Sequence, residues 1–252
     1  MSQNRTIYRA LEIMKYISHS NSPVTLDDIC KKFDLPKTSA YVIVSTLVDN
    51  HFLQLHKTPV QTFSIGLAAY QIGLAYEKNL SYSTIMQEPL INLANELGKT
   101  AFFAIPNDLE IIYLLKFEPE NPILTTGRIG GTNPIHCTAL GKSMLSYYKD
   151  EDIENILNRI TFESKTKYSI TNKTDFYNEI NKVRENGYAI DMRELSEFSV
   201  CVSAPILNAQ GCLEGAISVS GLYNKAENYL ETAKLVKECA STISRKLGYI
   251  KS

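Results

Sequence analysis

The chain has 252 residues, 44% of them hydrophobic, which is enough for one large domain or two modest ones. Its 26 Lys and Arg against 27 Asp and Glu give a net charge of −1, so overall charge neither indicates nor excludes a nucleic-acid partner. There is no apolar run of about 18 residues and no apolar stretch of a secretory signal in MSQNRTIYRA, so we expect a cytoplasmic protein without a membrane span. The five cysteines are odd in number and widely spaced, which argues against a disulfide framework and a zinc site.

The first predicted element is a helix over residues 5–18, where apolar residues recur at steps of three and four. Its inward face is expected to carry Ile7, Ala10, Leu11, Met14 and Ile17. After Pro23, the pair Thr25 and Asp28 predicts the capped start of a second, short helix. A tight turn over residues 34–36 then leads to a third helix, with Pro36 at its start.

The third helix is expected to point Ala40, Ile43, Val44 and Leu47 inward and its hydroxyl-rich face outward. Three short helices with a tight turn between the second and third are typical of a helix-turn-helix. Residues 52–66 predict two short strands about a Thr58–Pro59 turn, which is a wing. We therefore expect a winged helix-turn-helix domain over residues 1–66, whose seven basic and five acidic side chains give it a weakly positive charge of +2.

A helix over residues 67–80 is expected to connect this domain to the rest of the chain and to pack against a partner chain. Residues 81–252 then alternate between strand-like and helix-like patterns, which predicts an α+β domain with an antiparallel sheet. The predicted strands are TAFFAI, EIIYLLKF, PILTT, YAID, VCVSAPIL and CLEGAISVS. The predicted helices cover residues 84–97, 138–148, 150–159, 174–186 and 224–247.

Five segments together resemble one known family, in its order and spacing: NRTIYRALEIMKYI, LPKTSAYVIVSTL, PIHCTALGKSML, NGYAIDMRELSEFSVCVSAPI and GAISVSG. They resemble the IclR family of bacterial regulators over nearly the whole chain. The resemblance implies a winged helix-turn-helix followed by a GAF-like effector domain, and a dimer, often paired into a tetramer. It also implies double-stranded operator DNA near metabolic genes, a repressor's role, and a small organic acid, sugar acid or aromatic compound as effector.

The chain departs from the family pattern at five positions. Val42 stands where the family usually has an arginine, and His51 stands where a glycine is common. Arg193 replaces an acid, Phe198 replaces a glycine and Leu222 replaces a proline. These departures affect the operator and the effector that the resemblance implies, and leave the expected architecture unchanged.

Side chains near the start of a recognition helix read bases in the major groove, and flanking basic residues contact the backbone. The DNA-binding candidates are Arg5, Arg9, Thr25, Lys37, Thr38, Ser39, Tyr41, Ser45 and Lys57. The alternative is a solvated helix face without a partner. A second alternative, suggested by Val42, is a regulator with a degenerate DNA head that acts through protein contacts.

In GAISVSG, residues Ile217 and Val219 alternate with Ser218 and Ser220, so one face packs in the core and the other offers hydroxyls. The family resemblance places the effector-binding residues at Arg128, Ala139, Leu140, Asp191, Cys201, Ser218 and Ser220. Backbone N–H groups at the start of the predicted helix after Thr138 are suited to a carboxylate. The alternatives are that the serines bond to neighbouring backbone, that Cys201 is a core residue and that Asp191 caps a turn.

Enzymatic chemistry has little support in the sequence. HCTALGKS looks like a phosphate loop, but the position that requires its first glycine is His136. The residues His136, Cys137 and Cys201 lack the spacing of metal ligands, and no nucleophile is paired with a base. We therefore expect no cofactor and no catalytic residue, and an enzyme is the less favoured alternative to a regulator.

Overall fold

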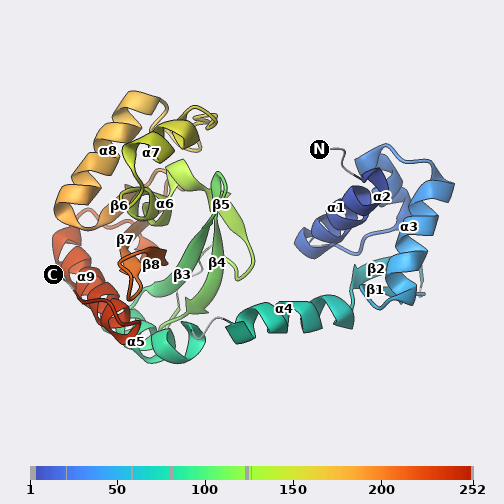
Figure 1. Cartoon of the computed structure of the whole chain (residues 1–252), viewed down its shortest axis with the longest axis horizontal. Helices are drawn as coiled ribbons and strands as arrows, with labels where there is room; N and C mark the ends of the chain where they lie inside the picture. Colours follow the sequence, from blue (N-terminus) through green and yellow to red (C-terminus); the bar gives the residue numbers. More distant parts are fainter. Residues whose placement is uncertain are drawn as a thin grey trace. The chain divides into compact units, whose positions relative to one another are not determined.

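The computed structural model describes residues 4–20, 22–57, 59–79, 82–122, 125 and 127–250. The chain divides into two compact units, Met1–Ser81 and Tyr82–Ser252, each with its own hydrophobic core (Figure 1). The helix that we predicted as a connector belongs to the first of these units.

The first unit holds three helices and a two-stranded sheet, followed by a fourth helix. In chain order these are α1 (Arg5–His19), α2 (Leu26–Phe33), α3 (Lys37–Asp49), β1 (Leu53–His56), β2 (Thr62–Ile65) and α4 (Leu67–Asn79). The strands β1 and β2 pair antiparallel, with Leu53 opposite Ile65. The predicted winged helix-turn-helix is confirmed, although Thr58 of the predicted wing turn lies outside the described residues.

The short helix α2 owes its limits to local chemistry at both ends. The Thr25 hydroxyl accepts from the Asp28 N–H at 3.2 Å, and the Asp28 carboxylate accepts from the Thr25 N–H at 3.0 Å. This reciprocal capping box is the one predicted from the sequence. Asp34 ends the helix in the left-handed region at φ 49°, and Pro36 then serves as the N-cap of α3.

The buried face of α1 agrees with the prediction at Ala10, Met14 and Ile17, which pack in or against the core, and differs from it at Ile7 and Leu11. Ile7 and Leu11 are 60% and 53% exposed, whereas Ile13 and Ile17 are buried in the core. Two apolar stripes overlap along this helix, and both satisfy steps of three and four residues. The core of the unit covers the later stripe, so the earlier one remains on the surface of the chain.

His51 lies just after α3 at φ 61°, in the left-handed region that favours glycine. This conformation explains why a glycine is expected at this position, because a Cβ there costs about 1 kcal/mol or more. Its carbonyl oxygen accepts from the N–H of Ala68 at 3.0 Å. A Cβ at Gly66 would lie 2.2 Å from the same oxygen, so the chain can pass here only with glycine at position 66.

The second unit is built on one six-stranded antiparallel sheet in the order β5-β4-β3-β8-β7-β6. Its strands are β3 (Thr100–Asn107), β4 (Glu110–Phe117), β5 (Thr132–Pro134), β6 (Ala189–Met192), β7 (Ser199–Leu207) and β8 (Leu213–Leu222). Its helices are α5 (Tyr82–Leu97), α6 (Ala139–Leu145), α7 (Asp150–Leu157), α8 (Lys173–Asn186) and α9 (Tyr229–Lys246). A 3₁₀ turn, Ile135–Cys137, leads into α6. The predicted α+β class is confirmed.

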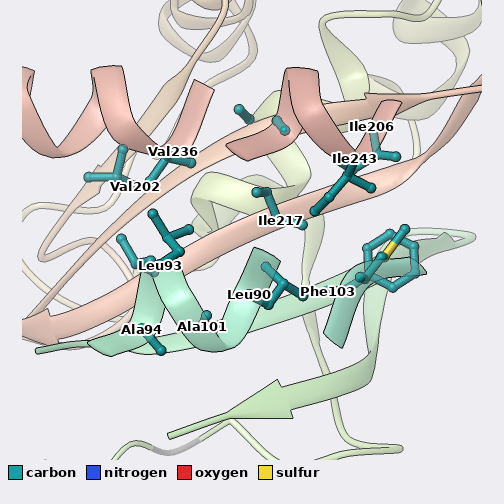
Figure 2. Close-up of a cluster of buried hydrophobic side chains, with 14 of the residues drawn as sticks. Leu90, Leu93, Ala94, Ala101, Phe103, Val202, Ile206, Ile217, Val236 and Ile243 are labelled. Atoms are coloured by element: carbon teal, nitrogen blue, oxygen red, sulfur yellow. The ribbon is translucent and has the colours of Figure 1, made fainter. Parts of the chain in front are cut away.

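Helices cover both faces of this sheet (Figure 1). On one face, Leu90 and Leu93 of α5 and Val236 and Ile243 of α9 pack against the strands, as Figure 2 shows. On the other face, α6, α7 and α8 pack against side chains that include Phe102. A strand residue therefore meets one of two different environments according to its place in the alternation.

Three predicted features of this unit differ from the structure: a helix start, a missed strand and a strand that is not formed. The last helix begins at Tyr229 and not at 224, because the Asn228 side chain caps it by accepting from the N–H of Leu230. The short strand β5 was missed, since a three-residue edge strand has no detectable alternation. The predicted strand PILTT covers residues 122–126, of which 123, 124 and 126 lie outside the described residues, and the described ones belong to no strand.

Candidate effector pocket and DNA-binding face

The candidate pocket begins as a row of side chains set by strand register. Asp191 of β6 lies opposite Cys201 of β7, which lies opposite Ser220 of β8. The next row of the same face places Ser218 opposite Phe102 of β3. Residues opposite one another in neighbouring strands share a face. Register alone therefore gathers a carboxyl, a thiol, two hydroxyls and an aromatic ring on the face that α6 covers.

The start of α6 closes over this row. Thr138 is its N-cap, and the Thr138 hydroxyl accepts from the Gly141 N–H at 3.0 Å. The N–H groups of Ala139 and Leu140 belong to the first turn, where helical donors have no acceptor within the helix. A Cβ at Gly141 would lie 1.9 Å from the Ile135 carbonyl oxygen, so glycine is required for this close approach.

These elements surround a small cavity, with a volume of about 30 Å³ open to the centre of a water-sized molecule. Its lining residues are Phe102, Tyr113, Gly127, Thr138, Ala139, Leu140, Asp191, Leu195, Ser199, Cys201, Ser218 and Ser220. An apolar cup with a few placed polar groups is typical of small-molecule sites.

Asp191 is the chemically most unusual residue of the cavity, because its side chain is fully buried. Its Oδ1 accepts from the N–H of Glu194 at 2.6 Å and from the N–H of Leu195 at 3.4 Å, so it caps the turn after β6. Its Oδ2 is buried and has no hydrogen-bond partner among the described residues. Burial, reinforced by the nearby Glu194 carboxylate, raises the pKa of Asp191 from 3.8 to about 7.

Behind the cavity, a buried ion pair joins α6 to the loop after β6. Lys142 Nζ lies 2.5 Å from Glu194 Oε1 and 3.6 Å from Glu179 Oε1, and it also donates to the Ile190 carbonyl at 3.1 Å. Burial raises the pKa of Glu194, and Lys142 opposes that rise. The lysine of HCTALGKS is therefore occupied inside the protein, which is the physical reason that this segment is no phosphate loop.

Two further lining groups are neutral at ordinary pH. Burial raises the pKa of Cys201 and of Tyr113 to about 12. The Cys201 thiol donates to the Ser220 hydroxyl at 3.3 Å, and the Tyr113 hydroxyl accepts from the Asn133 amide at 3.0 Å. Neutral, hydrogen-bonded groups of this kind suit recognition of a polar ligand better than nucleophilic chemistry.

Six of the seven sequence-predicted effector residues line the cavity, and Arg128 does not. Arg128 is exposed in the loop before β5. Sequence reasoning did not select several other lining residues, among them Phe102, Tyr113 and Leu195. Phe102 and Tyr113 belong to no sequence motif. Their ring centroids lie 5.1 Å apart because β3 pairs with β4.

On the first unit, α3 presents a polar face. Lys37, Thr38 and Ser39 are exposed, and Tyr41 and Val42 are each 62% exposed. These residues cluster at the first two turns, as expected for a recognition helix.

Three of the other DNA-binding candidates are exposed, and two have hydroxyls that are already engaged. Arg5 and Arg9 are exposed on α1, and Lys57 is exposed directly after β1. Thr25 uses its hydroxyl as the cap of α2, and Ser45 is half-buried with its hydroxyl on the Val42 carbonyl.

The Lys37 ammonium is paired with Asp27 of α2 at 2.9 Å, with both side chains exposed. This contact raises the pKa of Lys37, mainly through the hydrogen bond from its ammonium to Asp27. An exposed pair of this kind contributes little to stability, so Lys37 remains able to exchange its partner.

Among the described residues, no group of three or more His, Cys, Asp or Glu is arranged to hold a metal ion. No helix in the described ranges is long and apolar enough to cross a membrane.

A helix-turn-helix unit with an exposed polar α3, followed by an antiparallel-sheet unit with an enclosed polar cavity, defines a class: DNA-binding transcription regulators that respond to small molecules. Residues 74–245 match the family described as bacterial transcriptional regulator IclR C-terminal, and residues 6–56 match the IclR helix-turn-helix domain. The chain therefore belongs to the IclR family, whose members compared here are regulators and not enzymes.

Relatives match along almost the whole chain. It is 26% identical to the HTH-type transcriptional regulator KipR of Bacillus subtilis, over 98% of this chain and 99% of KipR. It is 23% identical to the HTH-type transcriptional repressor AllR of Escherichia coli K12, over 97% of this chain and 90% of AllR.

Solved structures give the same result for the fold. The crystal structure of Thermotoga maritima IclR matches with a TM-score of 0.76 and 28% identity, over 97% of this chain and 99% of that one. An IclR homologue from Microbacterium hydrocarbonoxydans, solved with 4-hydroxybenzoate, matches with a TM-score of 0.83 and 15% identity, over 96% of this chain and 98% of that one.

The burial of Asp191 predicts a pH-dependent difference in stability. Its folded-state pKa of about 7 lies above its ordinary value of 3.8, so the folded protein holds the proton more tightly than the unfolded chain. The stabilisation is complete below pH 3.8 and is lost as pH rises to 7. We expect Asp191→Asn to gain stability relative to wild type by about 1.4 kcal/mol per pH unit in this window.

Urea denaturation of both proteins at pH 5 and pH 7 measures this difference, and titrating groups that do not interact with Asp191 cancel in the comparison. Unfolding free energies that stay parallel across the two pH values would show that Asp191 is ionised inside the folded protein.

Proposed function

We propose that this protein is a cytoplasmic repressor of nearby metabolic genes, whose affinity for its operator is set by a small organic acid or sugar acid in the cavity. The observation that carries the proposal is the placing of N–H donors and a buried carboxyl on different walls of one cavity. The repressor's role is supported by AllR, which is named a repressor and matches along nearly the whole chain.

The walls of the cavity favour a ligand with two different ends. The first turn of α6 offers N–H groups and the positive end of a helix, which suit a carboxylate. Asp191 Oδ2, together with the Ser218 and Ser220 hydroxyls, suits a hydroxyl or another hydrogen-bond donor. A hydroxy acid satisfies both walls at once. The homologue solved with 4-hydroxybenzoate is a precedent for such a ligand in this fold.

The DNA reader in this proposal is the exposed start of α3. Lys37, Thr38, Ser39 and Tyr41 reach base edges and phosphates, while Arg5, Arg9 and Lys57 contact the backbone. The exposed Val42 gives no charge to this face, so the remaining basic residues supply the attraction to DNA. The same feature favours the second candidate, a regulator that acts through protein contacts without DNA.

The protein acts in this proposal as a homodimer, or as a tetramer of paired dimers. Ile7, Tyr8 and Leu11 of α1 are 46–60% exposed, and Leu67 and Tyr70 of α4 are each more than 60% exposed. Apolar residues at such spacing along helices of one unit are suited to burial against a second copy. The effector then shifts the balance between two arrangements of the dimer, of which one fits the operator.

The DNA-binding face is tested by the double variant Lys37→Ala with Thr38→Ala. We expect a loss of operator affinity of about 100-fold or more, because a phosphate contact and a base contact are removed together. Lys182→Ala is the matched control, since Lys182 is an equally exposed lysine on α8 of the second unit. Gel shifts at two salt concentrations measure the effect, with circular dichroism to verify folding. Wild-type protein that binds no DNA at low salt would favour the protein-contact candidate instead.

The effector site is tested by thermal shift and calorimetry with lactate, gluconate and 4-hydroxybenzoate as probes. We expect at least one to raise the melting temperature of wild type and to change operator affinity. Ser220→Ala should weaken that binding several-fold by removing one hydrogen bond. Ser241→Ala, which changes a serine in the groove beside α9, should leave it unaltered. Equal binding by both variants would place the ligand elsewhere.

The oligomer is tested by Leu11→Glu, which places a charge on the exposed stripe of α1. We expect the variant to sediment as a smaller species than wild type while its thermal unfolding changes little, because Leu11 lies outside the core. Lys15→Glu on the same helix is the control for added charge. A wild-type protein that is monomeric at micromolar concentration would refute the dimer.

A further inference from the structure

Most of the cavity wall is formed by strand residues and by the start of α6. The strand residues and the start of α6 are held by the sheet and by close packing, with Ala139 and Leu140 almost fully buried. Outside these elements, Gly127 lies in the loop before β5, and a six-residue loop, residues 193–198, joins β6 to β7. Leu195 of this loop lines the cavity, while Glu197 and Phe198 are exposed to solvent. Segments with few buried contacts open first in a folded protein.

The loop is anchored firmly at its beginning. Glu194 is buried and paired with Lys142, and its carbonyl oxygen accepts from the Ser169 hydroxyl at 2.7 Å. The carbonyl of Arg193 accepts from the Thr166 hydroxyl, also at 2.7 Å. Movement is therefore confined to the part after Glu194, which holds the lining residue Leu195.

The Arg193 side chain holds the remainder of the loop. Its guanidinium lies between two rings, 4.2 Å from the centroid of Tyr168 and 4.7 Å from the centroid of Tyr223. From this position its Nε donates to the Glu197 carbonyl at 2.7 Å. The two tyrosine rings hold the guanidinium in place. The guanidinium in turn holds the loop through its hydrogen bond to the carbonyl of Glu197, two residues after Leu195.

We propose that residues 195–198 form a lid over the cavity and that Arg193, on the anchored part of the loop, is the positioning residue that keeps this lid closed. Arg193 stands at a position where the family usually has an acid, so this latch belongs to this chain's own sequence. Cation–π contacts at partly exposed sites are modest, so thermal motion opens the lid and admits a ligand. The biological meaning of the lid rests on the proposed effector site, but the lid itself is testable without any effector.

Cys201 provides the probe, because it lines the cavity behind the lid. Cys201 is half-buried and the pKa of its thiol is raised to about 12, so its reaction with methyl methanethiosulfonate is slow and becomes faster when the cavity opens. Two other cysteines are internal references. The exposed Cys212 reports the activity of the reagent. Cys239, half-buried between α5 and α9 on the opposite face of the sheet, reports changes in the unit away from the cavity.

The experiment follows labelling of each cysteine by mass spectrometry in wild type, Arg193→Ala, Arg193→Lys and Tyr168→Leu. We expect Arg193→Ala to accelerate labelling of Cys201 about tenfold, with Cys212 and Cys239 unchanged. Tyr168→Leu should act in the same direction. Arg193→Lys should be intermediate, because an ammonium keeps the charge but lacks the planar group and the Nε donor. Glu197→Ala is the matched control, since it alters the lid but keeps the carbonyl that Arg193 binds.

Two results would overturn the inference. Cys201 labelling that is unchanged in both Arg193→Ala and Tyr168→Leu would show that the stack holds nothing closed. Equal acceleration of Cys201 and Cys239 would show that Arg193 stabilises the whole unit and has no role in a lid. If the lid behaves as expected while no acid binds, the proposed effector class fails and this inference stands.

Discussion

The register between β6, β7 and β8 is the constraint on which the second unit depends. It aligns Asp191, Cys201 and Ser220 in one row, on the face that α6 covers. Because side chains alternate between faces, a shift of one residue in either pairing would turn these groups toward α5 and α9. Val202 and Val219 would then face the cavity, which would lose its polar groups. The apolar packing of one face therefore fixes the chemistry of the other.

The buried charges are the second feature that shapes this unit. Lys142 and Glu194 are removed from water, so each needs the other, and Lys142 also donates to a backbone carbonyl. Among the described residues no cation forms an ion pair with Asp191, and burial raises the pKa of its carboxyl to about 7. Lys142 lies on α6, and Asp191 and Glu194 lie at the end of β6 and in the turn after it; both segments also contribute to the cavity wall. A ligand in the cavity would therefore contact both segments at their joint.

Much of the architecture was predictable because its determinants are local. The capping box of Thr25 and Asp28, and the termination of α8 at Gly187, depend on residues within a few positions of each other. The face of α1 was predicted only in part: two overlapping apolar stripes were equally periodic, and the tertiary core, which selects between them, leaves Ile7 and Leu11 exposed. For the cavity, the family resemblance indicated the residues of β7, β8 and α6. Phe102, Tyr113 and the Lys142–Glu194 pair join segments far apart in the chain, so no local pattern could indicate them.

The contact between Lys37 and Asp27 bears on how a regulator searches a genome. In the free protein the ammonium already has an oxygen anion beside it, placed by the neighbouring helix. On the proposed DNA face, a phosphate must replace that carboxylate, and this exchange offers less gain than contact with an unpaired lysine would. Binding to DNA of arbitrary sequence depends on phosphate contacts alone, so its affinity would lose a larger fraction than the affinity for the operator would. Because an exposed pair is weak, this competition would lower the affinity for arbitrary duplex only slightly, and base recognition would still decide where the protein stays.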